Sequence, residues 1–115
     1  MARYVCSFTL AVPIENLFPS LREVLKSCNF EILYDAGDYL MGREVPGHIA
    51  FSKLVTAEVL VDRTTATARE VRMSLVIKNE ELPLQLDNHC RQIFESVQRA
   101  IAESDRWQLL ESVSS

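Results

Sequence analysis

The sequence predicts an α+β fold in which a five-stranded antiparallel sheet carries two helices on one face. Apolar and polar residues alternate with period two through residues 55–61 and 71–77, which is typical of strands with one buried face. Residues 17–28 and 90–104 instead repeat apolar side chains at helical spacing. Shorter alternating segments complete the order strand, helix, four strands, helix, and helices then cover one face of the sheet.

The two central strands are expected to form a hairpin. The apolar residues of both strands occupy odd-numbered positions, so the numbers of directly paired residues must sum to an even number. The connection must then contain an odd number of residues, and we expect three or five. With three loop residues, Glu58 faces Arg72 on the face of the sheet that points away from the core.

The N-terminal third of the chain predicts a strand followed by a helix. The strand covers about residues 3–12. With Asn16 as the N-cap, Pro19 takes the third helical position, where its missing N–H group is not needed. The apolar stripe of the helix ends at Cys28, and Asn29 can adopt the left-handed conformation that ends it.

Four strands, the second to the fifth of the chain, are expected after this helix. The first covers residues 30–35, and a turn at 35–38 leads into the next strand at about 39–45. Pro46 and Gly47 then form a turn into a long fourth strand that begins near residue 49.

Asp87 or Asn88 is expected to cap the second helix. Its charged residues lie opposite its apolar stripe, which indicates that one side faces the sheet and the other faces water. Residues 105–115 contain the single tryptophan, Trp107. This tail continues the helix, folds back onto the domain, or docks on a partner. The charged residues on the outward side of the second helix are Arg91, Glu95, Arg99 and Glu103.

Length and composition indicate one domain over residues 1–115, with 105–115 as a separate C-terminal tail in one interpretation. The hydrophobic fraction of 48% and the charged fraction of 24% are those of a globular protein, and no segment is long enough to span a membrane. A net charge of −4 argues against nucleic acid as the main partner. Three widely spaced cysteines indicate reduced thiols and a cytoplasmic location.

The predicted order of elements resembles one half-repeat of the TATA-box-binding protein fold, and it also resembles a shortened helix-grip ligand-binding fold. The stretch KNEELPLQLDNHCRQIFESV, residues 78–97, resembles small conserved cyanobacterial proteins with no assigned function. The first resemblance implies that the uncovered face of the sheet is the working surface. The side chains on that face are largely small and neutral, and such side chains suit a protein surface better than phosphates. We expect this face to display Val5, Ser7, Thr9, Ser52, Leu54, Thr56, Glu58, Leu60, Arg72, Ser74 and Val76.

The candidate interaction residues combine this face with the tail. They are Leu54, Thr56, Leu60, Ser74, Val76, Trp107 and Leu110.

Candidate catalytic and metal residues are sparse. His89 and Cys90 are adjacent on a helix, so their side chains point about 100° apart and do not face each other. The histidines and cysteines show no recognised ligand spacing, and we predict no catalytic residue, metal or cofactor. An enzyme would require a cleft that gathers His48, His89 or Glu58.

Three functions remain open. The first is a noncatalytic interaction or assembly module, which binds a protein partner or a second copy of this chain. The second is a carrier of a small apolar ligand, with a cavity of roughly 300 Å³ or more between the sheet and the helices. The third is an enzyme whose site is not visible in the sequence.

Overall fold

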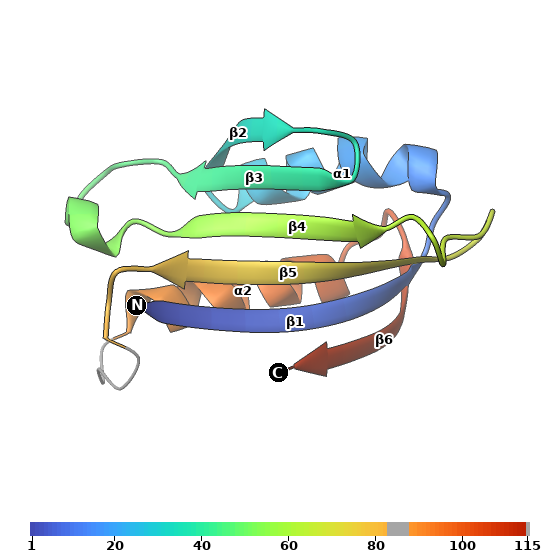
Figure 1. Ribbon diagram of the computed structural model, residues 1–115. Helices are drawn as coiled ribbons and strands as arrows, with labels where there is room; N and C mark the ends of the chain where they lie inside the picture. Colours follow the sequence, from blue (N-terminus) through green and yellow to red (C-terminus); the bar gives the residue numbers. More distant parts are fainter. Residues whose placement is uncertain (83–87, 115) are drawn as a thin grey trace.

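The computed structural model describes residues 1–82 and 88–114, and it shows one antiparallel sheet with both helices on the same face (Figure 1). The α+β class is therefore confirmed. The strands of the sheet follow the order β2-β3-β4-β5-β1-β6. In chain order the elements are β1 (Ala2–Ala11), α1 (Ile14–Ser27), β2 (Phe30–Asp35), β3 (Tyr39–Glu44), the 3-10 helix η1 (Phe51–Lys53), β4 (Thr56–Asp62), β5 (Val71–Asn79), α2 (His89–Ala102) and β6 (Gln108–Ser114).

The predicted number of five strands is wrong, because part of the tail forms a sixth strand. Strand β6 pairs antiparallel with β1 at the edge of the sheet, and a register shift lies between Thr9 and Leu10 of β1. Leu109 and Leu110 are neighbours, so the segment lacks the apolar alternation that marks a strand. An edge strand buries little side-chain surface. Its conformation is therefore determined by pairing with β1 and not by an apolar pattern.

In the central hairpin the numbers of directly paired residues sum to an even number, as predicted, but the loop is longer than predicted. Leu60 lies opposite Ser74, an even sum, and the odd-numbered side chains of both strands are buried. Nine residues, 63–71, nevertheless lie between the last directly paired residues, Asp62 and Arg72, so the expectation of three or five loop residues is wrong. The Asp62 carboxylate accepts hydrogen bonds from the hydroxyl groups of Thr64 and Thr65, and these bonds stabilise the longer loop.

The longer loop also changes the cross-strand partner of Glu58. Glu58 lies opposite Val76 and not opposite Arg72, which pairs with Asp62. Its carboxylate instead forms an ion pair with Lys78, with 2.6 Å between Glu58 Oε1 and Lys78 Nζ.

Strand β4 begins later than the sequence indicated. Residues 51–53 form a 3-10 helix in which the Lys53 N–H group donates to the Ala50 carbonyl at 2.8 Å. The predicted start near residue 49 is therefore wrong, and Ser52 lies outside the sheet.

Helix α1 begins at Ile14, directly after Pro13, and not after Asn16. The Asn16 N–H group donates to the Pro13 carbonyl at 3.0 Å and closes the first turn. Pro19 therefore lies inside the helix, contrary to the prediction. Because Pro19 is exposed, water can reach the Glu15 carbonyl that lacks an intrahelical partner. At the other end of α1, Asn29 has the expected left-handed conformation, with φ of 70°.

The core lies between the sheet and the helices. The Asn88 side chain accepts a hydrogen bond from the Arg91 N–H group at 3.1 Å and caps α2, as expected; Asp87, the alternative cap, lies outside the described residues. No helix in the described part of the chain is long and apolar enough to cross a membrane. The largest fully buried side chains are Phe8, Leu10, Leu17, Leu21, Leu25, Leu40, Leu75, Ile77, Ile101, Val55, Val59 and Val71.

Candidate functional site

Three of the candidate interaction residues lie together on the uncovered face of the sheet. Directly paired residues of antiparallel strands point to the same face, so the strand register arranges this face in rows that cross the strands. One row runs from a tyrosine through an exposed leucine and two serines to an exposed valine. In order across the sheet it contains Tyr39, Leu60, Ser74, Ser7 and Val113.

The uncovered face is hollowed along β5 and β1. Hollows of about 340 and 540 Å³ share Leu60 and Ser74, and a further hollow of about 220 Å³ shares Ser7 and Arg72 with the second. The three hollows therefore adjoin one another at these shared residues. We call this surface the β5–β1 trough. The side chains of β1 and β5 that line it on the uncovered face are Arg3, Val5, Ser7, Thr9, Arg72, Ser74 and Val76.

Two exposed apolar side chains line the trough, and one of its hollows extends past the first of them, Leu60, to Tyr39 of β3. Leu60 on β4 is 56% exposed and Val113 on β6 is 50% exposed. The serines between them are short, so they lie below both. The sheet is therefore lower at the two serines than at Leu60 and Val113, and Arg72 lies beside Thr9 at one end of the trough.

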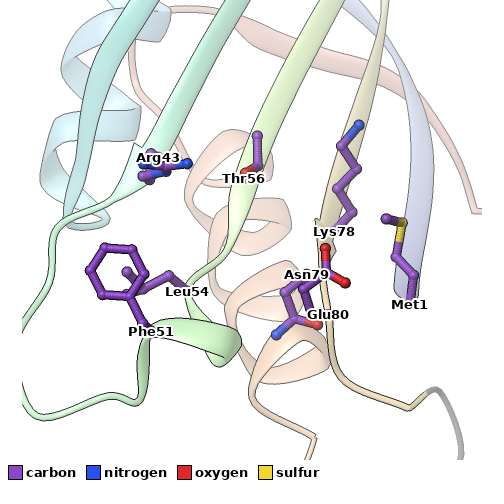
Figure 2. Close-up of a pocket in the computed structure, with 8 residues that line it drawn as sticks. All are labelled: Met1, Arg43, Phe51, Leu54, Thr56, Lys78, Asn79 and Glu80. Atoms are coloured by element: carbon purple, nitrogen blue, oxygen red, sulfur yellow. The ribbon is translucent and has the colours of Figure 1, made fainter.

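Two other candidate residues, Leu54 and Thr56, lie around a separate hollow of about 170 Å³ at one end of the uncovered face. Figure 2 shows Leu54 beside the ring of Phe51, across the hollow from Asn79 and Glu80. Leu54 ends the 3-10 helix and is not in β4, so it borders the sheet face and does not lie on it.

The remaining two candidates lie in or beside β6. Trp107 is 7% exposed, and its Nε1–H group donates to the Ile101 carbonyl at 2.9 Å. It is therefore part of the core and cannot contact a partner directly. Leu110 is exposed and lies at the register shift between β6 and β1.

The uncovered face carries an ion pair between Glu58 and Lys78, and further charged residues that include Arg3, Asp62, Arg72 and Glu111. Burial, together with the carboxylate of Glu58, raises the pKa of Tyr39. The Thr64 and Thr65 hydroxyl groups lower the pKa of Asp62, so this carboxylate is ionised at neutral pH.

A buried polar cluster lies on the other side of the sheet, at the N-terminal end of α2. The imidazole Nε2 of His89 lies 2.9 Å from each carboxylate oxygen of Glu44, and Glu44 Oε1 also accepts the Val55 N–H group at 3.1 Å. Glu44 therefore connects β3 to α2 and to the segment before β4.

Glu81 belongs to the same cluster and satisfies the first N–H groups of α2. Its carboxylate accepts the N–H groups of Cys90 at 2.9 Å and His89 at 3.2 Å, as well as the Asn79 amide at 2.6 Å. Burial opposes the ionisation of Glu81, but the hydrogen bonds from these three residues outweigh it, and the pKa of Glu81 lies below its usual value. The carboxylate thus stabilises the positive end of the helix dipole.

The geometry of this cluster is structural and does not favour nucleophilic catalysis. Burial, reinforced by the negative charges of Glu81 and Glu44, raises the pKa of the Cys90 thiol to about 12, whereas a nucleophilic cysteine needs a thiolate. The sheet separates His89 from Glu58, and His48 is exposed in the segment before η1, so these three groups do not form a common cleft. Among residues 1–82 and 88–114, no group of three or more potential ligands could hold a metal ion.

Sequence reasoning missed both glutamates of this cluster. Glu44 follows Leu40 and Gly42 on the buried side of β3, and this parity could have identified it as an inward-facing carboxylate. For Glu81 no local signal existed, because it lies in a loop and only the folded chain brings it to the start of α2.

Comparisons with known proteins give no family and no function. No protein-family model matches the chain, and no curated protein matches it. Among solved structures, the chain is similar to a conserved protein from Geobacillus kaustophilus, with 13% identity and a TM-score of 0.38, over 92% of this chain and 99% of that one. The resemblances to cyanobacterial proteins and to the TATA-box-binding fold stay predictions.

Proposed function

We propose that this protein is a noncatalytic interaction or assembly module whose uncovered sheet face binds a protein partner. The observation that carries the proposal is the β5–β1 trough, a set of adjoining hollows on the uncovered face beside the exposed side chains of Leu60 and Val113. Exposed apolar side chains beside small neutral ones on an uncovered sheet face favour contact with another protein surface.

The small-ligand alternative receives less support. It requires a cavity between the sheet and the helices, whereas the hollows described above open on the uncovered face or at its rim. A hollow that is open along its whole length leaves one side of a small molecule in water, and small-molecule sites usually enclose most of the ligand.

We further propose a cytoplasmic location. Cys6, Cys28 and Cys90 are all free thiols, and such residues are most common in a reducing compartment.

The proposal is tested by native mass spectrometry of the protein purified gently from its own source. We expect an additional protein mass on the wild-type chain. Leu60→Arg places a charge at the border of the trough and should remove that mass while the circular dichroism spectrum remains unchanged. Leu33→Arg is the matched control, because Leu33 is 48% exposed but lies on β2, away from the trough. Retention of the partner by Leu60→Arg would refute the proposal.

A further inference from the structure

Strand β6, at the edge of the sheet beside β1, is anchored to the core at its start (Figure 1). Strands β4 and β5 bury every second side chain, whereas along β6 only Leu109 is half-buried and the other side chains are exposed. Leu109 lies opposite Leu10 and packs against the core, and Trp107, just before the strand, is buried. These two side chains hold the first part of β6 in place.

The rest of β6 has no comparable anchor. We call residues 111–114 the β6 end. Ser112 lies opposite Phe8 and Ser114 opposite Cys6, and both of these β1 side chains are buried on the side of the helices. Directly paired residues of antiparallel strands point to the same face, so both serines also face the helices. The β6 end therefore carries hydroxyl groups on the face where β4 and β5 carry buried apolar side chains.

The side-chain contacts of the β6 end are polar. Ser112 Oγ lies 3.4 Å from Cys6 Sγ, and the Gln98 amide on α2 donates to Ser114 Oγ at 3.2 Å and to Cys6 Sγ at 3.4 Å. When such contacts break at a solvent-exposed site, water replaces them, so the net free energy that they contribute is small. Backbone pairing with β1 is then the main interaction that holds the β6 end.

The register shift in β1 provides a hinge. The shift lies between Thr9 and Leu10, and it divides the pairs that involve residues 108–109 from those that involve the β6 end. Leu110 lies between the two groups, outside the register of direct pairs. Because an extra residue in a ladder lets the strand bend, rotation at Leu110 can move the β6 end and leave Leu109 in place.

The β6 end covers one of the two buried thiols. Cys6 is fully buried, and both serines of the β6 end lie within 3.9 Å of its sulfur. Cys90 is buried at the start of α2, where its thiol lies 3.9 Å from the Ala2 carbonyl, and β6 pairs only with residues 6–11 of β1. Departure of the β6 end therefore exposes Cys6 and leaves Cys90 buried.

From this geometry we infer that the β6 end is a strap that detaches from β1 at Leu110 while the rest of the sheet stays folded, and that it controls access to the Cys6 thiol. Local openings of this kind occur where few apolar contacts are lost. A thiol-directed reagent reaches Cys6 only while the strap is open. The inference is independent of the proposed function, because it needs no partner on the uncovered face.

The first test is alkylation by iodoacetamide at pH 8, followed by mass spectrometry of the peptides, in a Cys28→Ser variant. The thiolate sulfur displaces iodide and forms a thioether. We expect Cys6 to react more slowly than an exposed thiol but at least about 100-fold faster than Cys90, which requires a larger unfolding event.

A disulfide that fixes the strap provides the matched comparison. Ser7 and Val113 are directly paired, so Ser7→Cys with Val113→Cys in the same background joins β1 to the β6 end. This variant should slow alkylation of Cys6 at least about 10-fold. Leu60→Cys with Ser74→Cys joins the directly paired residues of β4 and β5 and is the control, because it should leave the rate at Cys6 unchanged.

Hydrogen exchange of the unaltered protein tests the strap without any substitution. The amide groups that pair the β6 end with β1 should exchange at least about 100-fold faster than those that pair β4 with β5. Three results would each overturn the inference: equal alkylation rates at Cys6 and Cys90, an unchanged rate at Cys6 in the variant that joins β1 to the β6 end, or equal exchange in both pairs of strands.

Discussion

Replacement of Glu81 by alanine should destabilise the fold strongly, although Glu81 lies in a loop. The change leaves the N–H groups of His89 and Cys90 without their acceptor at the start of α2. The loss of an N-cap typically costs about 1 kcal/mol, and a buried N–H group left unsatisfied costs about 1–3 kcal/mol. The Asn79 amide also loses Glu81 as an acceptor, but it still donates to the Lys53 carbonyl at 3.0 Å, so this loss adds little to the destabilisation. We expect a loss of about 3 kcal/mol in the free energy of unfolding.

The expected change in melting temperature follows from chain length. An unfolding entropy of about 2.1 cal/mol/K per residue amounts to about 0.24 kcal/mol/K for 115 residues, so 3 kcal/mol lowers Tm by about 12 °C. Differential scanning calorimetry and urea denaturation at pH 7 measure this change. Glu80→Ala is the matched control, because Glu80 is exposed and should change the free energy by less than about 0.5 kcal/mol.

The pH dependence provides a second check of the same interaction. The pKa of Glu81 is lowered on folding from its ordinary value of 4.5, so its stabilising contribution is fully present above about pH 4.5 and is lost as the pH falls through the folded-state pKa. The difference in stability between wild type and Glu81→Ala should therefore shrink on acidification. A difference below about 1 kcal/mol at pH 7, or one equal to that of Glu80→Ala, would show that Glu81 does not cap α2.

The remaining predictions concern other parts of the fold. Glu44→Leu removes the acceptor of His89 and of the Val55 N–H group, and urea denaturation should show a loss of about 2–4 kcal/mol, compared with less than 0.5 kcal/mol for the exposed Glu31→Leu. Trp107→Phe removes the hydrogen bond to Ile101 and should cost about 1 kcal/mol in the same assay; an unchanged midpoint would contradict this role. A thiol reagent at pH 8 should modify Cys28 first in the native protein, because Cys6 and Cys90 are buried; rapid reaction that persists in Cys28→Ser would be inconsistent with the structure.

The position of Trp107 shows that only the tertiary structure determines whether a residue of the tail belongs to the core. The sequence placed it in a tail that could pack on the domain or dock on a partner. In the structure its ring is buried, and β6 continues from it as the edge of the sheet. Leu109 and Leu110 are adjacent, so no period-two pattern predicted a strand there.

By itself the sequence determined which side chains of β1, β4 and β5 face the core and where the two helices carry their apolar stripes. These features are local, because side-chain direction repeats every two residues in a strand and every 3.6 in a helix. Only the tertiary structure decided the sixth strand, the length of the central loop, the cluster of Glu44, Glu81 and His89, and the β5–β1 trough. Each of these depends on hydrogen bonds or register between segments far apart in the chain, and local periodicity carries no information about such pairing.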